Sequence, residues 1–63
     1  MPLVQVHMLE GRSDEQKRTL IAKVTDAVCE SVGAPREAVR VLITEMPKTH
    51  WGIGGKSAQE LGR

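Results

Sequence analysis

The chain has 63 residues and a formal net charge of +1, with nine basic side chains against eight acidic ones. This length predicts one small domain, residues 1–63, and a domain near this size buries only about 60% of its unfolded surface, so it often needs disulfides, metal or oligomerisation. The single cysteine excludes an internal disulfide, and no group of Cys and His has metal-ligand spacing, which leaves self-association as the source of additional stability. The small net charge excludes bulk attraction to nucleic acid or membranes.

The first two residues carry a chemical possibility of their own. Pro2 directly follows Met1, and a small residue at this position allows methionine aminopeptidase to remove Met1. The freed Pro2 carries a basic secondary amine, which its own ring holds rigid. A fixed free amine can act as a general base. Many proteins begin Met-Pro without this consequence, so this feature alone leaves the function open.

The chain also lacks targeting features. No apolar run approaches the roughly 20 residues of a membrane span, and the first residues lack the apolar region of a signal peptide. A lone thiol without a targeting signal suits the reducing cytoplasm. The sequence therefore predicts a cytoplasmic protein.

Residues 3–9 alternate as a strand does, with an apolar face and a mixed face. The apolar face consists of Val4, Val6 and Met8, and the mixed face of Leu3, Gln5 and His7. His7 is either a hydrogen-bonded structural residue or a catalytic one, and the structural interpretation is favoured.

A long helix follows. Ser13 has the features of an N-cap, and Gln16 completes an S-x-x-Q capping box with it. Gly33 is expected to end the helix, which should run from about Asp14 to Val32. Cys29 has no His or Lys on its face to activate it, so we expect a packing or exposed thiol and not a nucleophile. The apolar residues at helical spacing form one predicted core stripe: Leu20, Ile21, Val24, Ala27, Val28 and Val32.

Residues 39–44, Val39-Arg40-Val41-Leu42-Ile43-Thr44, are rich in β-branched side chains and predict a second strand. Strand, helix and strand, with about six residues on the return, form a βαβ unit with a parallel strand pair. The predicted fold class is therefore α+β. Two strands and one helix cannot close a core, so they need strands from another copy of the chain.

The composition of the chain changes after Pro47. Residues 48–55, Lys48-Thr49-His50-Trp51-Gly52-Ile53-Gly54-Gly55, contain three glycines, which favours a short hairpin or an arm that reaches onto a neighbour. The Gly-Ile-Gly-Gly run lacks the Gly-Lys-Ser/Thr ending of a phosphate loop. Residues 56–63 are predicted to form a frayed turn or a tail.

Three side chains in these predicted elements and loops are candidates for a functional role. Arg12 precedes the helix N-cap and is either a solvated loop charge or joins the helix terminus in attracting an anion. Arg40 interrupts an apolar strand and, once desolvated, needs a carboxylate from Glu45, from Glu10 or from a ligand. Trp51 is the only aromatic residue and is either an interface anchor or the apolar wall of a site.

Four stretches form one recognisable pattern. They are Met1-Pro2, His7-Met8-Leu9-Glu10-Gly11-Arg12-Ser13-Asp14-Glu15-Gln16-Lys17, Val39-Arg40-Val41-Leu42-Ile43-Thr44-Glu45-Met46 and His50-Trp51-Gly52-Ile53-Gly54-Gly55. Over nearly its whole length the chain resembles the 4-oxalocrotonate tautomerase family, in the short-chain group that isomerises 2-hydroxymuconate. The resemblance implies the tautomerase β-α-β fold, assembly as a homohexamer (a trimer of dimers) and a role in aromatic hydrocarbon catabolism.

The resemblance also implies roles for four residues. Pro2, exposed by loss of Met1, corresponds to the catalytic base. Arg12 corresponds to the arginine that binds the far carboxylate of the dicarboxylic substrate. Arg40, supplied by an adjacent subunit, corresponds to the one that holds the near carboxylate and the 2-oxygen. Trp51 falls at the aromatic wall of the pocket, a position often filled by phenylalanine.

Such an isomerisation moves a proton between a dienol hydroxyl and a distant carbon, so one group must accept the proton and then donate it. The amine of Pro2 must be neutral for this. The nearby arginines and the apolar wall disfavour its protonated form, so we expect its pKa to fall below that of a free prolyl amine. The arginines also stabilise negative charge on the dienolate. No metal or organic cofactor is required.

Two alternatives stay open. Within the superfamily, the same proline with other partners hydrates or dehalogenates haloacrylates, or decarboxylates a 3-oxo acid. Those activities depend on acidic or other polar pocket residues. A retained Met1 acylates the proline nitrogen, and the chain is then a non-catalytic oligomeric module.

Overall fold

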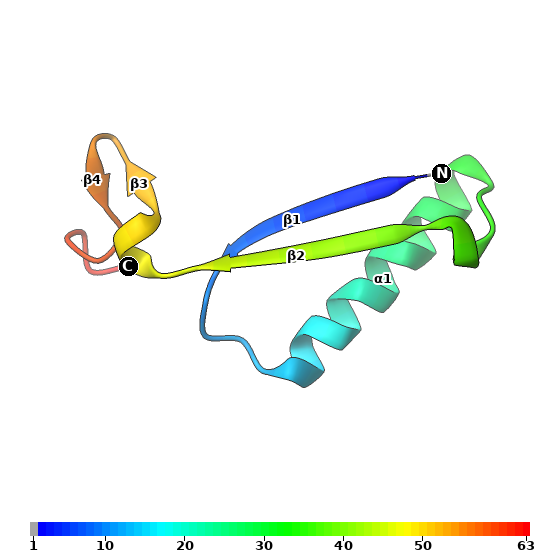
Figure 1. Cartoon of the computed structure of the whole chain (residues 1–63), viewed down its shortest axis with the longest axis horizontal. Helices are drawn as coiled ribbons and strands as arrows, with labels where there is room; N and C mark the ends of the chain where they lie inside the picture. Colours follow the sequence, from blue (N-terminus) through cyan, green and yellow to red (C-terminus); the bar gives the residue numbers. More distant parts are fainter. Residues whose placement is uncertain (1) are drawn as a thin grey trace.

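The computed structural model describes residues 2–63, so Met1, and with it the predicted removal of Met1, lies outside the described residues. One helix packs on a two-stranded parallel sheet, and a small hairpin extends beyond one end of the sheet (Figure 1). The chain is flat and elongated, with extents of 42 × 24 × 14 Å. The predicted α+β class, with one βαβ unit and a short C-terminal hairpin, is confirmed.

Strands β1 (Leu3–Leu9) and β2 (Arg40–Met46) pair in parallel over their full length. β1 has the predicted bounds. β2 begins one residue later than predicted because a 3-10 turn, η1 (Arg36–Ala38), precedes it. The amide of Val39 donates to the carbonyl of Arg36 in this turn at 3.1 Å and is therefore not part of the strand pairing. β2 also runs two residues beyond Thr44, because β1 supplies backbone partners that far.

Helix α1 (Asp14–Val32) has the predicted bounds. The predicted capping box fixes its start: the hydroxyl of Ser13 accepts from the amide of Gln16 at 3.1 Å, and the Gln16 side chain accepts from the amide of Ser13 at 2.9 Å. Its end is fixed by Gly33, whose φ of 72° is left-handed and whose amide donates to the carbonyl of Cys29 at 3.0 Å. Within residues 2–63, no helix is both long and apolar enough to cross a membrane.

The face of α1 that meets the sheet is narrower than the predicted stripe. Leu20, Val24 and Val28 are half-buried as predicted. Thr25 is buried beside them, and its hydroxyl is satisfied there because it donates to a carbonyl one turn back in the helix at 2.7 Å. The other predicted members are exposed in one copy: Ile21, Ala27 and Val32. That part of the prediction is wrong for the single chain. Two strands about 4.8 Å apart cannot cover the full flank of a helix about 10 Å across.

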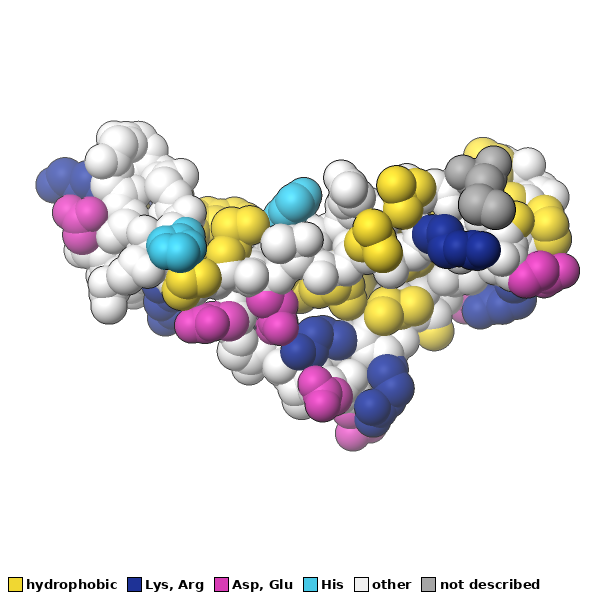
Figure 2. Space-filling view, viewed as in Figure 1, with side chains coloured by type: hydrophobic (Ala, Val, Ile, Leu, Met, Phe, Trp, Pro, Cys, Tyr) yellow, Lys and Arg dark blue, Asp and Glu magenta, His cyan; other side chains and the backbone are white. Residues whose placement is uncertain are grey.

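The far face of the sheet is uncovered within residues 2–63. Leu3 and Leu42 lie on it and are 57% and 50% exposed. Figure 2 shows hydrophobic side chains at the surface over the strands, between the hairpin and the N-terminal end. Among the described residues, Val39 and Ala58 are the only buried hydrophobic side chains. One copy therefore lacks a closed core, as the length and the element count predict.

We expect a stable oligomer, with no folded monomer at micromolar concentration. Burying a single leucine contributes about 1.5–3 kcal/mol, and a second copy is the available cover for the exposed leucines on the sheet. Sedimentation velocity at micromolar protein, with far-UV circular dichroism on the same sample, measures this. A compact, helical monomer in that experiment would contradict the prediction.

The C-terminal part of the chain, residues 47–63, is a small folded arm, which we call the C-terminal arm. It contains the 3-10 turn η2 (Lys48–His50) and the antiparallel strands β3 (Gly52–Ile53) and β4 (Lys56–Ser57). Gly54 and Gly55 turn the chain between these strands with φ values of 61° and 92°. The predicted short hairpin is confirmed. Of the two predictions for residues 56–63, the tail is wrong and the turn is found, at residues 58–62, but it is not frayed: it follows β4 and contains the fully buried Ala58.

Candidate active site

Pro2 and Arg40 lie together at one end of the sheet. The amide of Arg40 donates to the carbonyl of Pro2 at 3.0 Å, because Arg40 begins β2 opposite the first residue of β1. The Arg40 side chain is exposed, and its Nη1 donates to the carbonyl of Glu37 at 2.6 Å. A guanidinium has five N–H donors, so this contact anchors the side chain and leaves donors for a ligand. Sequence reasoning missed Glu37, because any residue supplies a main-chain carbonyl.

Neither predicted protein partner of Arg40 pairs with it. Glu45 lies near the opposite end of β2, where its carboxylate accepts from the ammonium of Lys17 at 3.0 Å. Glu10 is also at that opposite end, with its amide bonded to the carbonyl of Met46 at 3.0 Å. Within one chain, neither Glu45 nor Glu10 is therefore the carboxylate partner of Arg40. The parallel register keeps both carboxylates a strand's length away from Arg40.

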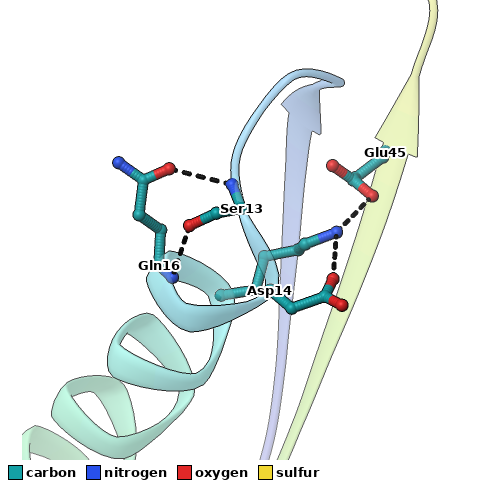
Figure 3. A network of polar contacts seen from close by, with 5 residues as sticks. Ser13, Asp14, Gln16 and Glu45 are labelled. Atoms are coloured by element: carbon teal, nitrogen blue, oxygen red, sulfur yellow. Dashed lines mark hydrogen bonds and ion pairs between the residues drawn. The ribbon is translucent and has the colours of Figure 1, made fainter.

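An ion pair made by Lys17 links the start of α1 to the end of β2. Its ammonium contacts the carboxylate of Glu45 at 3.0 Å and that of Asp14 at 3.4 Å; dashed lines mark both contacts at the labelled Glu45 and Asp14 in Figure 3. The pKa of Lys17 is raised, chiefly by the hydrogen bond to Glu45 and less by Asp14. Together with the capping box at Ser13, this ion pair fixes the loop that carries Arg12.

Arg12 lies in that loop, at the opposite end of the sheet from Pro2. Its side chain is exposed and borders an open cavity of about 190 Å³. The other residues around this cavity are Met8, Gln16, Lys17 and Leu20. Within residues 2–63 no salt bridge engages Arg12. Its charge is therefore available to an anion, which is the functional interpretation of this residue.

The length of β1 separates the two arginines within one chain. A parallel strand rises about 3.3 Å per residue, so the six steps from Leu3 to Leu9 span about 20 Å. Pro2 and Arg40 come before this span and Arg12 comes after it. One small molecule cannot contact both ends, so a single copy does not hold a complete site of the predicted kind.

Trp51 is carried by the C-terminal arm, beyond the end of the sheet where Arg12 lies (Figure 1). Its side chain is half-buried, and its carbonyl accepts from the amide of Ala58 at 2.7 Å. The structure thus places Trp51 at the Arg12 end and not at the Pro2 end. His7, opposite Thr44 in mid-strand, and His50, in η2, are both exposed.

Comparison with known proteins identifies a close sequence relationship. The profile of the family described as tautomerase enzyme matches residues 2–60. The 2-hydroxymuconate tautomerase of Stutzerimonas stutzeri is 62% identical over 63 residues, which is 100% of each chain.

Solved structures share the fold as well as the sequence. A 4-oxalocrotonate tautomerase isozyme from Methylibium petroleiphilum matches with a TM-score of 0.94 and 58% identity, over 98% of this chain and 100% of the other. A heterohexamer 4-oxalocrotonate tautomerase from Chloroflexus aurantiacus matches with a TM-score of 0.91 and 44% identity, over 97% and 98% of the two chains. Profile, full-length identity and fold agree: the chain belongs to the tautomerase enzyme family and is an isomerase of that family.

Proposed function

We propose that this tautomerase converts a 2-hydroxymuconate-type dienol into the conjugated 2-oxo-3-hexenedioate, in a cytoplasmic homohexamer built as a trimer of dimers. The observation that carries the proposal is the split of the site: Pro2 with Arg40 at one end of β1, and Arg12 with Trp51 at the other. Packing of copies against each other brings opposite ends together and covers the exposed sheet face. The full-length similarity to 2-hydroxymuconate tautomerases supports the choice of substrate.

Two arginines suit a substrate with two carboxylates. In the proposed site, Arg12 of one copy binds the far carboxylate, and Arg40 from an adjacent copy holds the near carboxylate and the 2-oxygen. The main-chain carbonyl of Glu37 accepts a hydrogen bond from the Arg40 guanidinium and so orients it without neutralising its charge. Trp51 forms the apolar wall, which excludes water and strengthens these charge interactions.

Pro2, freed from Met1, is the proposed proton carrier. Its neutral amine takes the proton from the 2-hydroxyl group of the dienol, and the resulting dienolate places negative charge on the 2-oxygen and on carbon 5. The protonated amine then returns the proton to carbon 5, which leaves a ketone at carbon 2 and one double bond between carbons 3 and 4. Arg40 stabilises charge at the oxygen, and Arg12 draws charge towards the far carboxylate.

The test is turnover by protein whose intact mass proves that Met1 is absent. Conversion of 2-hydroxymuconate is followed by absorbance, and proton NMR in D₂O locates the carbon that takes up the transferred hydrogen as deuterium. We expect isomerisation far above the solvent rate, with the new hydrogen on carbon 5. No acceleration over buffer by a correctly processed oligomer would refute the proposed substrate, and a new hydrogen on carbon 3 would refute the proposed proton path.

A further inference from the structure

The C-terminal arm is folded around Ala58, which is fully buried. The amide of Ala58 donates to the carbonyl of Trp51 at 2.7 Å, and the next amide, that of Gln59, donates to the carbonyl of Lys48 at 3.3 Å. These two bonds tie residues 58–59 to the segment that carries Trp51. The backbone position of Trp51 therefore depends on the turn that presents these two amides.

That turn begins with a reciprocal pair of side chains, Ser57 and Glu60. The hydroxyl of Ser57 accepts from the amide of Glu60 at 3.1 Å. The carboxylate of Glu60 accepts from the amide of Ser57 at 3.1 Å and from its hydroxyl at 3.0 Å. This is a capping box on a single turn. The same bonds lower the pKa of Glu60, the backbone bond most strongly, so the closed box favours the carboxylate form.

The other end of the turn is closed by the backbone. Gly62 has a left-handed φ of 72°, and its amide donates to the carbonyl of Gln59 at 3.1 Å. The amide of Arg63 donates to the carbonyl of Ala58 at 2.9 Å. This pattern is a Schellman motif. Residues 57–63 are thus one turn capped at both ends, and a segment this short has no helical stability of its own without its caps.

We propose that Ser57 and Glu60 are positioning residues, which hold the capped turn closed and thereby fix Trp51 as the apolar wall of the active site. The inference rests on the proposed function, because it takes Trp51 to be part of the substrate pocket. Opening the box lets the turn fray, which releases the Ala58 amide from Trp51. Substrate binding then weakens, while the proton-transfer groups, Pro2 and Arg40, are untouched.

The experiment uses the whole oligomer with four variants. Glu60→Ala and Ser57→Ala each break the box from one side, whereas Glu60→Gln keeps an acceptor oxygen that capping boxes accept. Gln59→Ala is the matched control, since it changes a side chain in the same turn and leaves the box intact. Trp51 is the only aromatic residue, so protein fluorescence reports on this one side chain.

Both box-breaking variants are expected to shift the Trp51 emission to longer wavelength, to increase its quenching by acrylamide and to raise KM about fivefold, the size expected for loss of a cap. Their kcat should stay within about twofold of the parent. Glu60→Gln and Gln59→Ala should match the parent in both readouts. If Glu60→Ala fails to assemble, Ser57→Gly opens the same box more mildly, because glycine is a tolerated N-cap.

Unchanged Trp51 fluorescence in both box-breaking variants would overturn the proposal, whatever happens to KM. A shifted fluorescence with an unchanged KM would also overturn it, because the turn would then position a tryptophan that the substrate does not touch. Failure of the proposed function is distinguishable from either result, since it appears as absent turnover in the parent protein itself.

Discussion

Blocking the amine of Pro2 is expected to abolish turnover while leaving the oligomer intact. Retained Met1 converts this nitrogen into a non-basic amide, and alkylation by a halopyruvate attaches a carboxylate-bearing group that occupies the space of the substrate, so in both cases the amine cannot exchange a proton with substrate. The measurement pairs intact mass with the isomerase rate on the same sample, and sedimentation checks the assembly. Full activity in protein that still carries Met1 would end the proline mechanism and move attention to His7 or His50.

Pro2→Ala provides the graded version of this experiment. Alanine after Met1 removal leaves a primary amine in nearly the same place, so some activity should survive, reduced by about 10²-fold if positioning of the base dominates. In the parent enzyme the rate should rise with pH as one group deprotonates. Its apparent pKa should lie below that of a free prolyl amine, because nearby arginines disfavour the protonated form. A rate that stays constant from acidic pH up to the pKa of a free prolyl amine would contradict the role of the amine.

Arg12→Ala and Arg40→Ala are expected to lose activity towards a diacid without unfolding. A hydrogen bond to a charged group contributes about 1.5–3 kcal/mol, which corresponds to roughly 10- to 100-fold in kcat/KM. With a monoacid enol such as phenylenolpyruvate, Arg12→Ala should have much less effect, because its proposed partner, the far carboxylate, is missing. Arg40→Ala should damage both reactions, because it binds the end that every substrate shares.

Arg18→Ala is the matched control for these two variants. Arg18 is an exposed arginine on α1, engaged in no salt bridge within residues 2–63, and its removal changes the net charge by the same amount. It should leave both reactions near the parent rate. Equal losses on diacid and monoacid in Arg12→Ala would refute the proposed division between the two arginines.

The sequence by itself determined the elements whose signals are local. The capping box at Ser13 and Gln16 and the stop at Gly33 fix both ends of α1 through contacts between residues close in the chain, so its bounds are predictable to the residue. The alternation in residues 3–9 likewise predicts β1 and its apolar face. The family pattern in residues 1–2, 7–17, 39–46 and 50–55 predicted the tautomerase relationship, which the comparisons confirm.

Only the tertiary structure decided which distant residues meet. It paired Lys17 with Glu45, and it placed Pro2 and Arg12 at opposite ends of one strand. These outcomes follow from the parallel register, which no local signal encodes, because pairing of strands depends on the path of the whole crossover between them. The helix face shows the same limit: spacing defines a stripe, but the width of the sheet decides how much of it is covered.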